Sequence, residues 1–193
     1  MEHQANRHVG TRTVSDGLRT GWRGLVVIVS MLTLSLLAAV AEIGQAQVVG
    51  EEAELDRLRA KAEDAMGNDD AEGAAMNMGR AALMAAQLGK RLSEPALRQI
   101  FKATEHLYRS QEHGYRGLAL FRRAGGELPA SAGVCGSLQL AQLELQHAQE
   151  SLAPSAPADR PDTASPRLPA IRQSTEDWAI VLSSMEGEFR CPN

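Results

Sequence analysis

The sequence predicts an all-α protein built from closely packed helical hairpins. Apolar residues recur at three- and four-residue steps along most of the chain after residue 50, and no stretch shows the strict alternation of a β-strand. Aromatic residues make up only 4% of the chain and alanine is abundant, so small and aliphatic side chains must form the core. We therefore expect a short array or bundle of helical hairpins, with a C-terminal helix that docks after a Pro-rich linker.

The first 46 residues are typical of an export signal. Seventeen uncharged residues, Leu25–Ala41, follow four arginines and end at Glu42. Small residues at Ala39-Val40-Ala41 and at Gly44-Gln45-Ala46 offer two positions for cleavage by a signal peptidase. The alternative is an uncleaved single-pass membrane anchor over 25–41, although a bilayer-spanning helix needs about twenty apolar residues. Because the arginines stay in the cytoplasm in both cases, we expect a periplasmic or secreted protein, or one anchored facing the periplasm.

The charge balance argues against a nucleic-acid partner. The chain carries 20 Lys and Arg against 24 Asp and Glu, a formal net charge of −4. Loss of residues 1–46 would remove four arginines and three acidic residues, which leaves the remainder slightly more acidic. Proteins that bind nucleic acids need a concentrated basic face. The rest of the chain is long enough for one helical domain, here 47–152.

Three helices are predicted in the first half of this domain. The first covers about Glu51–Met66 and ends at the turn Gly67-Asn68-Asp69-Asp70, in which one aspartate caps the next helix, Ala71–Arg91. Ser93-Glu94-Pro95 has the features of a helix start, namely a hydroxyl cap, a carboxylate at the positive end of the helix dipole and a proline in the first turn. This third helix is expected to end near Gln111.

The second half continues with shorter elements. His113-Gly114 predicts a break, after which Tyr115–Ala124 forms a fourth helix. Pro129–Leu152 is predicted as a fifth helix. The segment 153–170 is rich in Pro, Ala, Ser and Asp, cannot bury a core and is expected to be a linker. A last helix, about Arg172–Arg190, carries its large apolar residues at helical spacing and forms the C-terminal unit 171–193.

Residues 98–131 resemble one tetratricopeptide repeat, a helix–turn–helix unit of about 34 residues. The residues at the family's spacing are Phe101, Tyr108, Gly117, Phe121, Ala124 and Pro129. In such a unit Gly117 would let the second helix approach the first at Tyr108, and Pro129 would turn the chain into the next unit. The resemblance implies a helix-lined groove and a role in protein–protein interaction. A generic α-hairpin is the alternative.

The resemblance also places four polar residues of the third helix in that groove: Gln99, Lys102, His106 and Arg109. Lys102 is the type of residue with which the family holds a peptide carboxylate, whereas His106 stands where those clamps carry asparagine. Together the four donors would hold an acidic or carboxylate-ended segment of a partner protein. A plain polar outer face is the alternative.

Cys135 and Cys191 are the only cysteines. In an oxidising compartment an even number of cysteines predicts a disulfide. If the last two helices fold antiparallel across the linker, Cys135 near the start of one and Cys191 just after the end of the other meet. A redox-active pair would show CxxC spacing, which this chain lacks, so we expect a structural bridge.

No catalytic motif is present: the sequence contains no HExxH, GxSxG, phosphate loop or CxxCH. We therefore expect a non-catalytic protein of the bacterial cell envelope, with no cofactor and no metal, that binds a peptide or protein partner through a helical groove. The alternative is a small helical bundle that binds a metal or small ligand near His106 and His113, with Glu105 and Glu112 beside them.

Overall fold

The computed structural model describes residues 50–153 and 165–191 of the chain. Within them five α-helices pack against one another, where six were predicted. No β-strand forms among these residues, which confirms the predicted all-α class. The helices are residues 50–67, α2 (Ala71–Arg91), α3 (Pro95–Arg123), α4 (Ala132–Leu152) and α5 (Arg167–Phe189). The expected export signal or anchor, and most of the predicted linker, lie outside the described residues. None of the described helices is both long and apolar enough to span a membrane.

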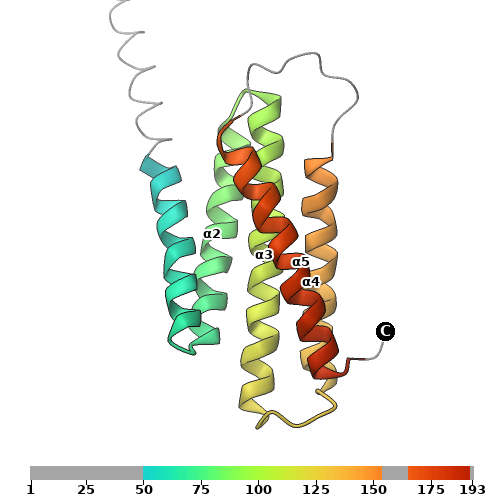
Figure 1. The fold of residues 1–193 in the computed structure, drawn as a ribbon. Helices are drawn as coiled ribbons and strands as arrows, with labels where there is room; N and C mark the ends of the chain where they lie inside the picture. The colour runs from blue at the N-terminus through green and yellow to red at the C-terminus, as the bar shows by residue number, and fades with distance from the viewer. Residues whose placement is uncertain (1–49, 154–164, 192–193) are drawn as a thin grey trace, which may run out of the picture. The chain divides into compact units, whose positions relative to one another are not determined.

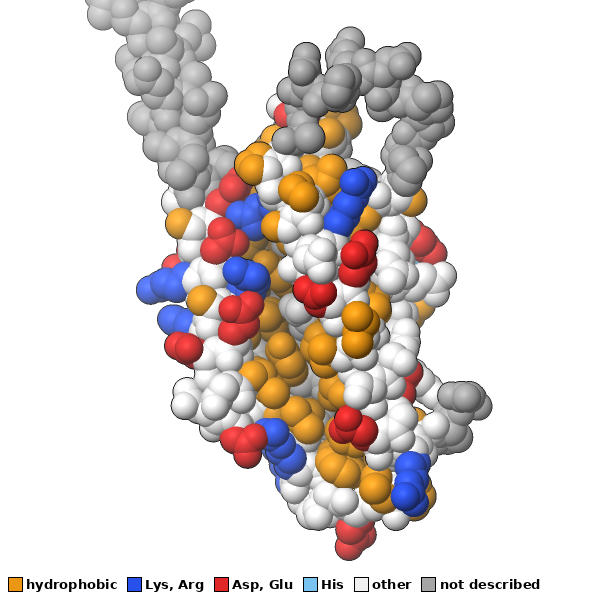
Figure 2. Space-filling model, in the orientation of Figure 1, with side chains coloured by type: hydrophobic (Ala, Val, Ile, Leu, Met, Phe, Trp, Pro, Cys, Tyr) orange, Lys and Arg blue, Asp and Glu red, His pale blue; other side chains and the backbone are white. Residues whose placement is uncertain are grey.

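Four helices form an up-and-down layer, and the fifth crosses it. Figure 1 shows helix 50–67, α2, α3 and α4 running alternately in opposite directions, with α5 lying obliquely over α3 and α4. All five contribute to one buried core of mostly alanine and leucine side chains. On the face that carries α5, Figure 2 shows apolar side chains in a hollow between helix 50–67 and α5, with charged side chains along its rim.

The predicted N-cap of α2 is confirmed, whereas the predicted hydroxyl cap of α3 is not observed. Asp70 is the N-cap of α2, and its Oδ1 accepts a hydrogen bond from the Gly73 N–H at 2.8 Å, which satisfies one of the unpaired N–H groups of the first turn. Pro95 occupies the first turn of α3 as expected. The cap residue there is Glu94 rather than Ser93, and no side chain makes a capping hydrogen bond.

The predicted break at His113-Gly114 is wrong. α3 continues without interruption from Pro95 to Arg123, and the predicted helix Tyr115–Ala124 is its last part. Gly114 serves close packing instead, because a Cβ at this position would lie 2.5 Å from Cζ2 of Trp178. Residues 98–131 therefore do not form the helix–turn–helix of one repeat, although the packed antiparallel helices are compatible with a repeat-like helical fold.

Gly117 also has a different neighbour from the one expected. Tyr108 lies on the same helix, and Gly117 faces α4, where a Cβ would lie 3.2 Å from Cδ2 of Leu138. Small residues thus line the side of α3 that meets α4 and α5. The buried members of this seam are Ala103, Ser110, Gly114 and Gly117.

Two buried hydroxyl groups fix α4 against α3. Ser110 Oγ donates to the carbonyl oxygen of Ala141 at 2.7 Å, and Ser137 Oγ donates to the carbonyl oxygen of His113 at 2.9 Å. Each hydroxyl reaches across the interface between the two helices. Because a sliding movement would leave these polar groups buried and unpaired, the two bonds set the register of α4 on α3.

Two helix boundaries near prolines differ from prediction. α4 begins at Ala132 rather than at Pro129, which lies in the preceding loop and follows a cis peptide bond. α5 begins at Arg167 rather than near Arg172, so the end of the predicted linker is helical. Pro169 is the third residue of α5, where the missing N–H costs no intrahelical hydrogen bond.

Trp178 holds the middle of α5 on the layer. Its side chain is only 4% exposed, and its indole Nε1–H donates to Ser110 Oγ at 2.8 Å. The ring of Tyr115 meets the indole edge to face, with centroids 5.3 Å apart. A buried indole N–H needs an acceptor, and the hydroxyl of Ser110 supplies it while donating onward to α4.

Both ends of α5 are also fastened. At the start, the guanidinium of Arg167 contacts the Asp56 carboxylate at 3.1 Å and lies 5.5 Å from the ring centroid of Phe101. At the end, the ring of Phe189 stacks on that of Phe121, with centroids 4.2 Å apart. Cys135 and Cys191 form a disulfide with an S–S distance of 2.05 Å, which agrees with the predicted pairing of antiparallel helices.

Substitution Gly114→Ala should destabilise the fold, because the new methyl group would overlap the indole of Trp178. We expect a loss of about 1–3 kcal/mol in the free energy of unfolding, measured by chemical denaturation. Gly136→Ala is the matched control: it lies inside α4 with nothing within 4 Å of an added Cβ, and should raise stability by about 0.5–1 kcal/mol. Equal effects at both positions would contradict the packing role of Gly114.

Removal of the disulfide should destabilise the chain strongly, because the bridge joins residues 56 positions apart. A chain-entropy estimate gives about 4 kcal/mol for a loop of this size. The double substitution Cys135→Ser, Cys191→Ser should lower the free energy of unfolding by a comparable amount. Thiol titration of the denatured wild-type chain should find no free thiol before reduction and two afterwards; two thiols before reduction would show that the bridge does not form.

Candidate functional site

The four predicted partner-binding residues all lie on α3, but they do not all line the same surface hollow. Gln99, Lys102 and His106 line two of them, one between α2 and α3 and one between α3 and α4. Arg109 lines a third hollow, farther along between α2 and α3. The structure therefore brings the first three together and places Arg109 in the adjoining part of the same helix pair.

The two hollows between α2 and α3 follow one another along this helix pair, and we call them together the α2–α3 groove. The first, of about 750 Å³, is lined on α3 from Pro95 to His106, and the second, of about 710 Å³, from Arg109 to Arg123. On α2 the lining includes several residues with little or no side chain. These are Ala75, Gly79, Ala85, Ala86 and Gly89. Such residues leave room for a bound segment to come close to the helix backbone.

The α2–α3 groove concentrates positive charge on an acidic protein. Seven Lys or Arg line it, against three Glu. The cations are Arg80 and Lys90 of α2 and Arg98, Lys102, Arg109, Arg116 and Arg123 of α3. On α3 these positions are four or seven residues apart, which places them on one face of the helix. Clustered charge of one sign attracts ligands of the opposite sign.

The positive charge is least compensated in the first hollow. In the second, Arg109 pairs with Glu105 at 3.0 Å, and Arg116 and Arg123 pair with Glu112 and Glu72. In the first, Lys90, Arg98 and Lys102 make no ion pair with any residue that the structure describes. The end of the groove that holds Gln99 and Lys102 therefore offers cations to an incoming carboxylate.

The second hollow adds exposed apolar side chains that the sequence analysis did not single out. Met76 and Leu83 of α2 line it and are 55% and 56% exposed. They are seven residues apart, so they share one face of the helix. Their exposure could have been inferred from the sequence, because neither residue belongs to the apolar stripe that α2 buries. The groove thus carries cations along its whole length and exposed apolar side chains in its second hollow.

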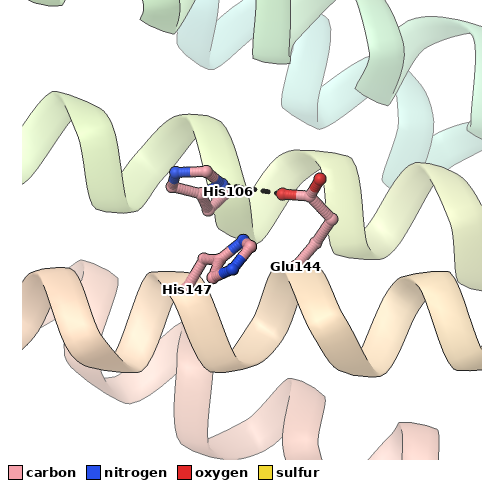
Figure 3. Close-up of side chains that lie close together, drawn as sticks. All are labelled: His106, Glu144 and His147. Atoms are coloured by element: carbon pink, nitrogen blue, oxygen red, sulfur yellow. Dashed lines mark hydrogen bonds and ion pairs between the residues drawn. The ribbon is translucent and has the colours of Figure 1, made fainter.

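His106 is engaged with α4 on the other side of α3. Its Nδ1 lies 2.7 Å from Oε2 of Glu144, and its ring lies edge to face with that of His147, with centroids 5.2 Å apart. Figure 3 shows the three side chains converging, one from α3 and two from α4. Glu144 and His147 were missed from the sequence because only the pairing of α4 with α3 brings them to His106.

The structure does not bring His106 and His113 together. Seven residues on one helix are separated by about 10.5 Å along its axis, too far for one ion. The Nδ1 atom of His113 is buried and has no hydrogen-bond partner among the described residues. Glu105 and Glu112, considered with them, are paired with arginines of the same helix. His106 and His113 therefore do not face one common site, and the side chains that converge on His106 are those of Glu144 and His147.

No known protein family, curated protein or solved structure matches this chain.

The imidazole of His113 should make stability depend on pH. Burial lowers the pKa of His113 from its ordinary value near 6.5, so the unfolded chain takes up a proton at a higher pH than the folded chain. The free energy of unfolding should therefore fall as the pH drops below about 6.5. His113→Gln should show a shallower fall between pH 7 and pH 5 in denaturation experiments. Parallel curves for the two proteins would contradict this assignment.

Proposed function

We propose that this protein is a non-catalytic interaction module that binds an acidic segment of a partner protein in the α2–α3 groove. The observation that carries the proposal is the gathering of seven cations on one helix pair of a chain with an excess of acidic residues. Charge of this kind, placed over a long and shallow surface, suits a peptide segment better than a small molecule.

The two halves of the groove would contribute differently to binding. Lys90, Arg98 and Lys102 would make charge-assisted hydrogen bonds to carboxylates of the partner, and Gln99 would add a neutral donor beside them. Met76 and Leu83 would bury apolar side chains of the same segment. An acidic amphipathic helix matches this division, because it carries carboxylates and apolar residues at helical spacing.

The compartment belongs to the proposal as well. The uncharged stretch Leu25–Ala41 after four arginines supports export, and the Cys135–Cys191 disulfide is of the kind that persists outside the reducing cytosol. We infer that the partner is a protein of the bacterial cell envelope. The antiparallel packing of α2 on α3, which is compatible with a repeat-like helical fold, supports the use of a helix-lined groove.

Photo-cross-linking in the producing cells tests this function. A photoreactive amino acid at Leu83, inside the groove, should give a discrete protein adduct, because the partner would cover this position. The same amino acid at Ile180, which is 72% exposed on α5, is the control and should give none. Similar adducts from both positions, or no adduct from Leu83, would contradict binding in the groove.

Charge reversal distinguishes binding in the groove from non-specific attraction that depends on net charge alone. The double substitution Arg98→Glu, Lys102→Glu should reduce the Leu83 adduct at least tenfold, because it places carboxylates where the partner's carboxylates would lie. Arg172→Glu, Arg190→Glu changes the net charge equally at exposed positions outside the groove and should leave the adduct unchanged. An equal loss in both variants would show that net charge alone governs the capture.

A further inference from the structure

We propose that His106, Glu144 and His147 bind one divalent transition-metal ion of the zinc class between α3 and α4. One ligand atom from each residue lies within 4.8 Å of the other two. Among the described residues this is the group of His, Cys, Asp and Glu side chains that converges in this way. The inference does not depend on what occupies the α2–α3 groove.

The donor set determines the class of metal. Two imidazoles and one carboxylate suit zinc and its neighbours in the first transition series, whereas calcium and magnesium prefer oxygen ligands alone. Three protein ligands leave a coordination position open, as in zinc sites that also hold water or a further ligand. The cysteines do not compete, because both are held in the disulfide.

The backbone positions of the ligands are set before any ion arrives. Glu144 and His147 are three residues apart on α4, so they project from one face of that helix, and His106 faces them from α3 (Figure 3). One turn from His106, Ser110 donates its buried hydrogen bond to Ala141 of α4. This bond holds the two helices in register, so rigid elements carry the site.

Small side-chain movements would complete the coordination. Ligand atoms around a zinc ion lie about 2.0–2.2 Å from the metal, so the three side chains must converge by a rotation about their own bonds. The hydrogen bond between His106 and Glu144 would be replaced by two bonds to the ion. The side chains of His106 and Glu144 are 20% and 21% exposed, which leaves an entry path from solvent.

A hollow lies beside the three side chains. His106 and His147 line a cavity of about 330 Å³ together with Gln99, Lys102, Glu150 and Ser151. Lys102 would oppose a cation there and Glu150 would attract one, so the charges of this pair offset each other. The cavity provides room for a water molecule or for one donor atom of a bound segment.

Zinc titration of the purified, metal-free chain without a histidine tag tests the site by calorimetry. The wild-type chain should bind one Zn²⁺ per molecule, and Zn²⁺ should raise its thermal unfolding midpoint. His106→Gln, Glu144→Gln and His147→Gln should each weaken binding at least tenfold. Glu176→Gln, at an exposed position on α5 away from this hollow, should change the affinity less than twofold. The variant His3→Gln, His8→Gln should bind as the wild type does, which excludes the two histidines before residue 50.

His147→Gln is the decisive variant, because it leaves the bond between His106 and Glu144 intact while removing the third ligand. The metal-free variant should still unfold cooperatively, and Zn²⁺ should no longer raise its unfolding midpoint. Absence of stoichiometric Zn²⁺ binding by the wild type would overturn the proposal and leave only a hydrogen bond between His106 and Glu144 beside a second histidine. Unchanged affinity in all three ligand variants would overturn it equally.

Discussion

The close approach of Trp178 to Gly114 is the constraint on which the arrangement of the helices depends. The indole ring lies where any side chain on residue 114 would stand, so α5 can reach α3 only over a glycine. Its buried N–H then requires an acceptor, which Ser110 provides, and the same hydroxyl donates to the backbone of α4. One chain of hydrogen bonds thus joins three helices in the core, and cooperative strengthening is expected in such a chain.

The position of α5 decides which part of α3 is core and which part is surface. The small residues Ser110, Gly114 and Gly117 face the neighbouring helices α4 and α5, whereas Arg98, Lys102 and Arg109 line hollows. Because of the helical periodicity, the small residues and the cationic residues lie on different faces of α3. Arg167, the aromatic stack at Phe189 and the disulfide hold both ends of α5 against the other helices.

The groove and the histidine cluster lie on two sides of α3 and share its support. Lys102 and His106 line hollows on both sides, but the imidazole of His106 bonds to Glu144 of α4. The charge of the two regions differs accordingly. The groove presents cations, of which Lys90, Arg98 and Lys102 have no ion-pair partner among the described residues. The cluster contains a carboxylate and two imidazoles, which are ligands for a cation. The cationic groove and the cation-binding cluster thus lie on different sides of the same helix.

Local patterns in the sequence were sufficient for the all-α class and for the helix Ala71–Arg91 with its aspartate cap. The pairing of Cys135 with Cys191 followed from the presence of only two cysteines in the chain. Periodicity and capping depend on neighbours within a few residues, so they can be read from the chain directly. The same patterns placed Gln99 and Lys102 on the helix that lines the groove. The continuity of α3 through Gly114 depended on Trp178, and the cluster around His106 depended on Glu144 and His147. Those partners are remote in the sequence, so only the packing of whole helices against one another decided them.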